Sequence, residues 1–292
     1  MQAIEARSLT KTYPGDITAL DELSFAVEEG SVFGLLRPNG AGKSTTVKIL
    51  TTLSRPDSGA ASVAGFDILA EPAAVRRAIG VVAQRSGLDR EATGRENLRL
   101  QGQLHDLGGD DLERRVDQLM GQFGLADAAG RRVREYSGGM RRRLDIALAL
   151  VHRPRVLFLD EPTTGLDPEV RGEMWSEIAR LTGEEGLTVL LTTHYMEEAD
   201  SLASRLAIVD RGAIVAEGSP DELKRELRGD AIHVELAEAV EGSHVSAVLE
   251  RLDGVRDAVV NGVRFHARAD DGARAVPGSS RHSSRAGSRL PR

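Results

Sequence analysis

Several short segments of the sequence carry residue types that handle phosphate. Residues 35–46 read LLRPNGAGKSTT, between an apolar stretch and a helical pattern. A glycine-rich loop at a helix start presents backbone N–H groups to phosphate. In such loops the lysine reaches the β- and γ-phosphates and the next hydroxyl binds Mg²⁺; the alternative is an ordinary strand–helix turn. The predicted nucleotide-binding residues here are Asn39, Gly40, Ala41, Gly42, Lys43, Ser44 and Thr45, with Ser44 also a predicted metal ligand.

The loop departs from the usual glycine pattern at its first position. Counting back from Gly42, the first glycine of the pattern falls at Arg37. A non-glycine residue forced into a left-handed backbone costs roughly 1–2 kcal/mol. At about 1.4 kcal/mol per tenfold in affinity, the largest expected loss is about one to two decades. Because Gly40 and Gly42 are retained, we predict a weakened site that still binds nucleotide.

Two adjacent carboxylates follow an apolar run in LFLDEP, residues 157–162. The run predicts a buried strand that delivers both acids to its end. We expect Asp160 to hold Mg²⁺ through water and Glu161 to orient or deprotonate the attacking water, since phosphoryl transfer depends on positioning and charge stabilisation. Taken alone, the pair is equally consistent with the start of a loop.

A second glycine-containing helix start lies in YSGGMRRRLDIALAL, residues 136–150. Ser137, Gly138 and Gly139 open an amphipathic helix, so their N–H groups form a further candidate anion site. By itself the segment is better explained as a helix start with a solvated arginine face. The presence of two such helix starts about a hundred residues apart favours nucleotide binding.

The elements that position these residues follow an α/β pattern. Apolar runs predict strands at 31–36, 79–84, 155–160, 187–192 and 205–210, and the first thirty residues read as strand and turn. Residues 44–53 predict a helix with Val47, Leu50 and Leu53 along one face. Residues 94–151 are helical, with apolar positions at helical spacing. These positions are Leu112, Val116, Leu119 and Phe123, then Met140, Leu144, Ala147 and Val151. We predict a parallel sheet with a helical subdomain.

The chain divides into three predicted regions. Residues 1–218 form the main domain, with its helical subdomain at about 88–152. Residues 219–277 form a small α+β appendage, whose first helix has Ser219 as N-cap and Pro220 at its first position. Residues 278–292 are rich in glycine, serine and arginine, which predicts a disordered tail.

Composition narrows the class of protein. The 292-residue chain has a net charge of −7, which argues against a general nucleic-acid binder. It has no cysteine, so disulfides and cysteine metal sites are excluded. No stretch approaches the ~20 apolar residues that cross a bilayer, so a membrane role requires a partner chain.

The order and spacing of the motifs over residues 1 to about 220 resemble the ATP-binding cassette family. The segments that carry the resemblance are Lys43, Gln84, SGGM at 137–140, Asp160-Glu161, GLD at 165–167 and His194. VFGLLxPNGAGKSTT, EPAAVRRAIGVV, TGRENL and YSGGMRRRLDIA look like the daunorubicin/doxorubicin-resistance type of ATP-binding subunit. The resemblance implies a P-loop NTPase core with an N-terminal antiparallel β subdomain. The last residues depart from the family's usual acidic-aromatic ending, as a truncated or frame-shifted end would.

The resemblance also implies roles for single residues. Tyr13 would stack on adenine, and its alternative is a strand-edge aromatic. Gln84 would bind Mg²⁺, sense the γ-phosphate and report to a permease, whereas without this context it is better explained as a strand-end amide. His194 would contact the γ-phosphate, whereas a lone histidine after a strand is more often structural. Asp167 would help to build a dimer in which Ser137, Gly138 and Gly139 of one copy cover the ATP of the other.

The expected function is that of an ATP-hydrolysing subunit of an export complex. It would work as a homodimer with ATP and Mg²⁺ at the cytoplasmic face of the cell membrane, bound to a separate transmembrane permease, for drug or antibiotic efflux. One alternative is a regulatory cassette that Arg37 has impaired in hydrolysis, and another is a lipid or polysaccharide exporter. A DNA-repair cassette would contain a long coiled coil between the glycine loop and SGG, and a ribosome-acting one would contain two cassettes; the sequence has neither.

Overall fold

The computed structural model describes residues 1–36, 43–226, 230–235, 255–261 and 264–269. They belong to two compact units, Met1–Asp221 and Glu222–Arg292. Arg37, the loop residues from Asn39 to Gly42 and the predicted tail at 278–292 lie outside the described residues. Lys43 and Ser44 are described by their backbone alone.

The first unit begins with an antiparallel sheet in the order β2-β1-β4-β5. Alternation along β2 puts Leu23, Phe25 and Val27 in the core, as expected for a sheet with one buried face. The strands are β1 (Gln2–Tyr13), β2 (Ile17–Glu28), β4 (Ser58–Val63) and β5 (Phe66–Asp67). This sheet confirms the predicted antiparallel β subdomain.

The second sheet has the order β10-β9-β3-β8-β7-β6 and is parallel except at β10. Its central strands are buried along their length, which explains their continuous apolar runs. The strands are β3 (Val32–Leu36), β6 (Ile79–Val82), β7 (Val156–Asp160), β8 (Thr188–Thr193), β9 (Arg205–Asp210) and β10 (Ala213–Gly218). The carboxyl ends of the parallel strands therefore meet at one edge, where ligands of open α/β sheets bind.

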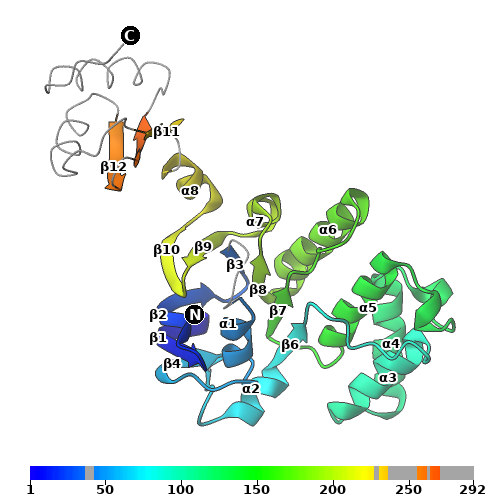
Figure 1. Cartoon of the computed structure of the whole chain (residues 1–292). Coiled ribbons are helices and arrows are strands. Elements are labelled where there is room, and N and C mark those ends of the chain that lie inside the picture. The colour runs from blue at the N-terminus through cyan, green and yellow to red at the C-terminus, as the bar shows by residue number, and fades with distance from the viewer. Residues whose placement is uncertain (37–42, 227–229, 236–254, 262–263, 270–292) are drawn as a thin grey trace, which may run out of the picture. The chain divides into compact units, whose positions relative to one another are not determined.

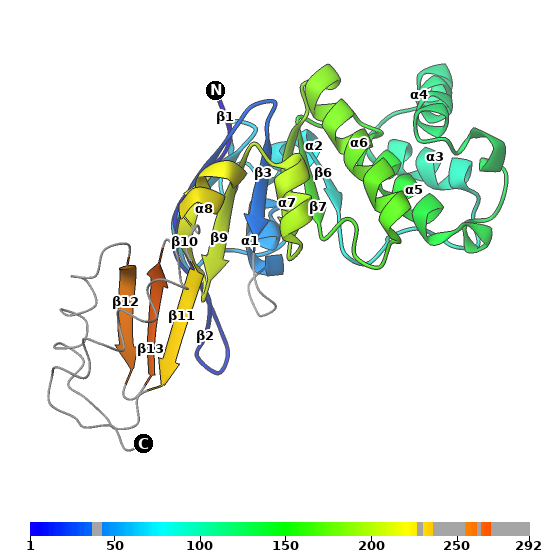
Figure 2. The ribbon, with the colours of Figure 1, turned by 90° about the horizontal axis from the view of Figure 1, so that it is seen from above.

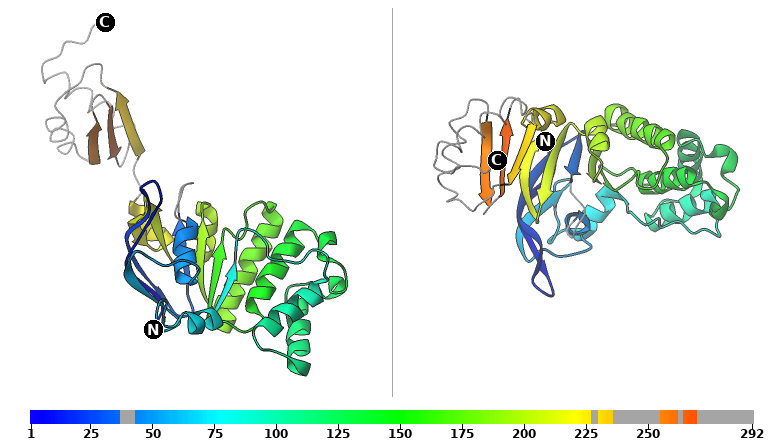
Figure 3. Two further views of the ribbon diagram at one scale, coloured as in Figure 1. Left: turned by 60° about the horizontal axis from the view of Figure 1, so that its bottom comes forward. Right: turned by 45° about the horizontal axis from the view of Figure 1, so that its top comes forward.

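The helices form two groups (Figures 1, 2 and 3). Those packed with the sheets are α1 (Lys43–Leu50), α2 (Pro72–Ala78), α5 (Gly138–Leu150), α6 (Pro168–Glu185) and α7 (Met196–Leu202). Helices α3 (Gly94–Leu104) and α4 (Gly109–Gln122) form the helical group to one side of the sheet in every view, with 3₁₀ turns at Ala126–Ala128 and Val133–Glu135. The predicted apolar positions on α4 and α5 are confirmed, since all are buried except Met140, which is half-buried.

The prediction of one apolar face through Val47, Leu50 and Leu53 is wrong at its last residue. Val47 and Leu50 are buried, but α1 ends at Leu50 and the side chain of Leu53 is 73% exposed. Thr52 takes a φ of +63°, and the N–H of Leu53 bonds back to the carbonyl of Lys48. The chain therefore turns away before the helical spacing reaches Leu53.

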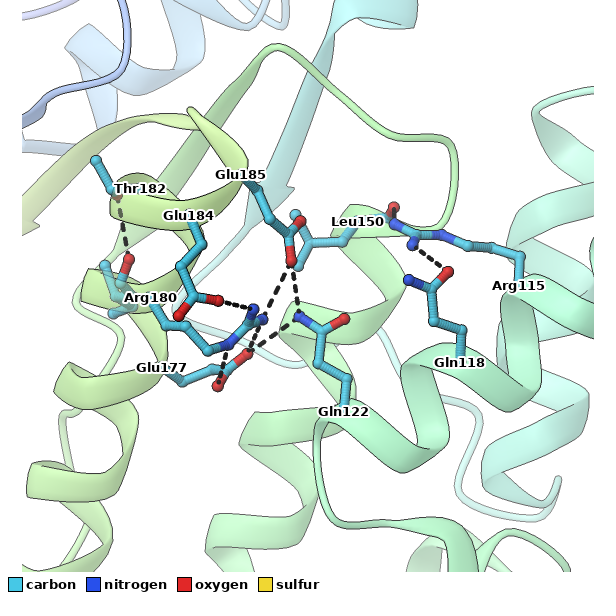
Figure 4. Close-up of polar contacts among 10 residues, drawn as sticks. Arg115, Gln118, Gln122, Leu150, Glu177, Arg180, Thr182, Glu184 and Glu185 are labelled. Carbon is cyan, nitrogen blue, oxygen red and sulfur yellow. Dashed lines mark hydrogen bonds and ion pairs between the residues drawn. The ribbon is translucent and has the colours of Figure 1, made fainter.

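Polar contacts join the helical group to the rest of the first unit. Gln122 of α4 donates to Glu177 at 3.1 Å and to Glu185 at 3.4 Å, both on α6. Arg180 lies between Glu177, Glu184 and Glu185 (Figure 4). These contacts fix the end of α4 against α6.

A stacked pair of imidazoles joins the end of α3 to the turn after α5. The rings of His105 and His152 lie 3.7 Å apart and are parallel to within 2°. Nε2 of His152 lies 2.9 Å from the carbonyl oxygen of Ile79, the first residue of β6, and its buried Nδ1 has no partner among the described residues. The pair therefore touches the helical group, α5 and the sheet edge together.

The chain enters its second unit within α8 (Pro220–Glu226), which begins at the predicted proline. The second unit contains an antiparallel sheet in the order β11-β13-β12. Its strands are β11 (Asp230–Glu235), β12 (Val255–Asn261) and β13 (Arg264–Ala269). Among the described residues of both units, no helix is long and apolar enough to cross a membrane.

Candidate functional site

The first part of the site lies where α1 begins. This helix starts at Lys43, directly after the glycine loop, and Thr45 in its first turn is buried. The hydroxyl of Tyr13, the last residue of β1, lies 3.4 Å from Oγ1 of Thr45. Nζ of Lys11 lies 5.8 Å from the centre of the Tyr13 ring. The structure therefore brings the aromatic ring beside the helix start that the sequence predicts to bind phosphate.

The second part lies at the carboxyl end of β7. Oδ1 of Asp160 accepts a hydrogen bond of 2.6 Å from the hydroxyl of Thr192 on β8. The N–H of Glu161 donates to the Thr192 carbonyl at 3.0 Å. Glu161 has a φ of +48°, in the left-handed region. Thr192 of β8 therefore holds the side chain of Asp160 and the backbone of Glu161.

The amide and the imidazole named in the sequence converge on Glu161. Nε2 of Gln84, just beyond β6, donates to Oε2 of Glu161 at 3.1 Å. Nδ1 of His194, just beyond β8, lies 3.5 Å from Oε1 of the same carboxylate, close to it but without hydrogen-bond geometry. The Glu161 side chain is only 12% exposed. Three neighbouring strands thus place an acid, an amide and an imidazole together at one edge of the sheet.

The second glycine helix start forms the beginning of α5. Oγ of Ser137 caps it by accepting from the N–H of Met140 at 3.1 Å. A Cβ added at Gly138 would meet nothing within 4 Å, whereas one at Gly139 would lie 2.7 Å from Cγ1 of Val170 on α6. Gly138 is therefore open to an approaching group, and Gly139 has a packing reason to lack a side chain.

Within one chain, the α5 start stands apart from the α1 start. No hydrogen bond or ion pair between described residues joins Ser137–Gly139 to Tyr13 or Thr45. Asp167 caps α6 by accepting from the N–H of Val170 at 3.0 Å. This cap gives Asp167 a structural role in the single chain, beside the dimer role that the resemblance implies.

Sequence reasoning missed Arg142, the buried arginine of α5. Its guanidinium donates to the backbone carbonyls of Asp160, Glu161 and Pro162, and to that of Ala83 beside Gln84. Burial lowers the pKa of this arginine. The signal that reveals it is helical spacing, because Gly139, Arg142, Ile146 and Ala149 all lie on buried positions of one helix.

Asp145 lies one turn further along α5 and contacts the segment after Gln84. The hydroxyl of Ser86 donates to Oδ1 of Asp145 at 2.9 Å. Burial raises the pKa of Asp145, and the Ser86 contact opposes that shift. Helix α5 therefore contacts both segments that deliver site residues, the one after β6 and the one after β7.

The chemistry of this site suits the attack of water on a phosphoanhydride. A helix start supplies backbone N–H donors for phosphate oxygens, and Glu161 supplies a carboxylate held among neutral donors. Asp160 and Gln84 add oxygen atoms of the kind that hard divalent cations prefer.

Comparison with known proteins agrees with a site for phosphate chemistry. The family described as ABC transporter matches residues 20–164. Daunorubicin resistance ATP-binding protein DrrA3 of Streptomyces coeruleorubidus is 53% identical over 237 residues, which cover 81% of this chain and 74% of that protein. Daunorubicin/doxorubicin resistance ATP-binding protein DrrA of Streptomyces peucetius is 45% identical over 286 residues, or 96% and 86% of the two chains.

A solved structure gives the corresponding fold. The dimeric post-hydrolysis state of the ATP-binding cassette MJ0796, bound to ADP and Pi, aligns with a TM-score of 0.68 at 26% identity. The alignment covers 74% of this chain and 98% of that one. The chain is 53% and 45% identical to the two resistance proteins over most of both chains, and its sheet edge is arranged for phosphate chemistry. The chain belongs to the ATP-binding cassette transporter family and is one of its ATP-hydrolysing subunits.

Proposed function

We propose that this ATPase powers the export of drugs of the daunorubicin and doxorubicin type through a separate membrane permease. The support is the similarity to two daunorubicin-resistance ATP-binding proteins over most of the chain. The described residues contain no helix able to span a membrane. The subunit would therefore reach the membrane by binding a permease at its cytoplasmic face.

The observation that carries the catalytic proposal is the convergence of Gln84 and His194 on the half-buried Glu161. Glu161 accepts the proton of the attacking water or orients it, and His194 and Gln84 face the γ-phosphate. The amide of Gln84 donates to the carboxylate and so fixes the orientation of the Glu161 side chain. Lys43 and the N–H groups at the start of α1 hold the phosphates, and Tyr13 stacks on adenine.

The residues present also fit a magnesium ion. The donor set would be the hydroxyl of Ser44, the amide oxygen of Gln84 and the carboxylate of Asp160, all hard oxygen ligands. Oδ1 of Asp160 is occupied by the Thr192 hydroxyl, which leaves Oδ2 for a water or an ion. When bound, Mg²⁺ neutralises charge on the β- and γ-phosphates.

We also propose that two copies close head to tail on ATP. Ser137, Gly138 and Gly139 of one copy would then cover the nucleotide held by Lys43 of the other. The open space at Gly138 supports this arrangement, as does the dimeric state of the similar cassette bound to ADP and Pi.

The first test of this function is the turnover of Glu161→Gln. Glutamine has nearly the same size as glutamate but cannot take a proton from water. We therefore expect the variant to bind ATP and to lose hydrolysis. It should also accumulate a nucleotide-bound dimer on gel filtration. Glu169→Gln, an exposed glutamate in the first turn of α6, is the matched control and should hydrolyse normally. Parental turnover in Glu161→Gln would remove Glu161 from the mechanism.

The second test concerns the exported compound. Inverted membrane vesicles that contain the chain and its permease should accumulate daunorubicin when ATP is added. Vesicles with Glu161→Gln serve as the control and should not. Accumulation of a lipid or polysaccharide precursor, with none of daunorubicin, would overturn the drug-export proposal and leave the ATPase intact.

A further inference from the structure

The guanidinium of Arg142 contacts the backbone of both segments that present the catalytic side chains. Nε donates to the carbonyl of Pro162 at 2.6 Å, and Nη1 donates to the carbonyl of Ala83 at 2.8 Å. Nη2 lies 3.3 Å from the carbonyl oxygens of both Asp160 and Glu161. One side chain of α5 therefore joins the residue before Gln84 to three successive residues around Glu161.

These contacts coincide with an unusual backbone conformation. A φ of +48° at Glu161 is uncommon for a residue other than glycine and persists where surrounding contacts hold it. With this turn, the carbonyls of Asp160, Glu161 and Pro162 all face the same guanidinium. Arginine suits the task because its N–H donors form a rigid planar fork, whereas lysine presents a compact ammonium on a flexible stem.

Arg142 also lies on the helix that begins with the second glycine motif. Its Cα is about one helical turn from Ser137–Gly139, and residues of one helix move together. The charged groups near its guanidinium are Asp145, Asp160 and Glu198. The side chain is only 9% exposed, so its position is fixed by these surroundings.

We propose that Arg142 is a positioning residue that sets Gln84 and Glu161 relative to the Ser137–Gly139 helix start. This inference rests on the proposed function, in which Glu161 acts on water and Ser137–Gly139 meets nucleotide held by the partner copy. Contact of nucleotide with the start of α5 moves Arg142, and Arg142 moves the backbone beneath Glu161. Completion of one catalytic site thus depends on the occupancy of the other.

The test is the separation of kcat from nucleotide affinity in Arg142→Lys. A displacement of about 1 Å at a reacting group costs roughly 100-fold in rate, so we expect kcat to fall by about 10- to 100-fold. Affinity for a fluorescent ATP analogue should stay within about twofold of the parent, because the phosphate-binding loop is untouched. Millimolar guanidinium added to Arg142→Ala should restore part of the lost turnover.

Arg115→Lys is the matched control. Arg115 is a half-buried arginine at the other end of α5, where it donates to the carbonyl of Leu150 (Figure 4). It also donates to the carbonyl of Val151. Its replacement should lower the melting temperature without lowering kcat. Equal losses of kcat in both variants would reduce Arg142 to a general stabiliser of α5 and overturn the proposal.

The outcomes also separate this inference from the proposed function. If Glu161→Gln loses hydrolysis and Arg142→Lys turns over at the parental rate, the positioning role is wrong and the function stands. If Glu161→Gln hydrolyses ATP normally, the function of Glu161 is wrong and the inference falls with it. In the double variant, Arg142→Lys should leave the nucleotide-trapped dimer of Glu161→Gln intact, since Arg142 acts on catalysis rather than on binding.

Discussion

At the scale of single residues, the site depends on contacts that are distant in the sequence. The apolar run before Asp160 and Glu161 predicts a strand and places both acids at its end. It does not predict Thr192, which bonds to Asp160 from β8. Nor does it predict the left-handed turn at Glu161, which in other proteins costs of order 1–3 kcal/mol and is held by its surroundings. The types of the site residues can be predicted from one segment of the sequence, but the orientation of their side chains cannot.

The predicted effect of Arg37 belongs to this scale as well. Arg37→Gly should strengthen ATP binding by up to about one decade if position 37 requires a left-handed backbone. Titration with a fluorescent ATP analogue at several salt concentrations measures this. Unchanged salt dependence together with tighter binding supports relief of strain.

A contrary result at position 37 is equally informative. Weaker binding with a shallower salt response would make Arg37 a phosphate ligand rather than a defect. Arg55→Ala, which removes an exposed arginine elsewhere in the first unit, controls for loss of one positive charge.

At the scale of elements, periodicity predicted the helices well where their apolar faces reach the core. Positions 112, 116, 119 and 123 are buried as expected. The prediction fails at Leu53, because a left-handed Thr52 ends the helical path before the spacing does. Sequence reasoning also missed the burial of Arg142. Its neighbours Arg141 and Arg143 suggest an exposed charge run, while the carbonyls that hold Arg142 belong to the segment after β6 and to the end of β7.

The two glycines at the start of α5 should respond differently to substitution. Gly139→Ala places a Cβ 2.7 Å from Val170, so we expect a loss of stability of about 1–3 kcal/mol from overpacking. Gly138→Ala meets open space in the single chain and should leave stability nearly unchanged while lowering ATP turnover. Urea unfolding together with ATPase assays distinguishes the two. Equal destabilisation by both variants would contradict the packing explanation.

At the scale of the first unit, the stacked His105–His152 pair makes stability depend on pH. Burial, helped by the neighbouring His105, lowers the pKa of His152 from 6.5 to about 4. Burial also lowers the pKa of His105, against the effect of Asp106. Between about pH 4 and pH 6.5 the unfolded chain binds more protons than the folded one. The free energy of unfolding therefore rises with pH across this range. The stability that comes from the neutral, buried His152 is fully present above about pH 6.5 and is lost as the pH falls toward 4.

The expected loss at about pH 5 is roughly 1 kcal/mol, since partial solvation of the ring reduces the ideal linkage value. Urea midpoints of the parent and of His152→Gln at about pH 7 and about pH 5 measure it. The variant should show the smaller change between the two conditions. An equal change in both proteins would assign the pH dependence to other groups.

The same stacked rings also supply a spectroscopic reporter. Face-to-face aromatic rings 3.7 Å apart shift each other's proton resonances strongly upfield, and that shift falls steeply as the rings separate. One ring belongs to the end of α3 and the other to the turn between α5 and β7. Any rotation of the helical group against the sheet would change their overlap. The proton NMR signals of these two histidines would then follow that rotation in solution, through each round of nucleotide binding and release, with no label attached to the protein.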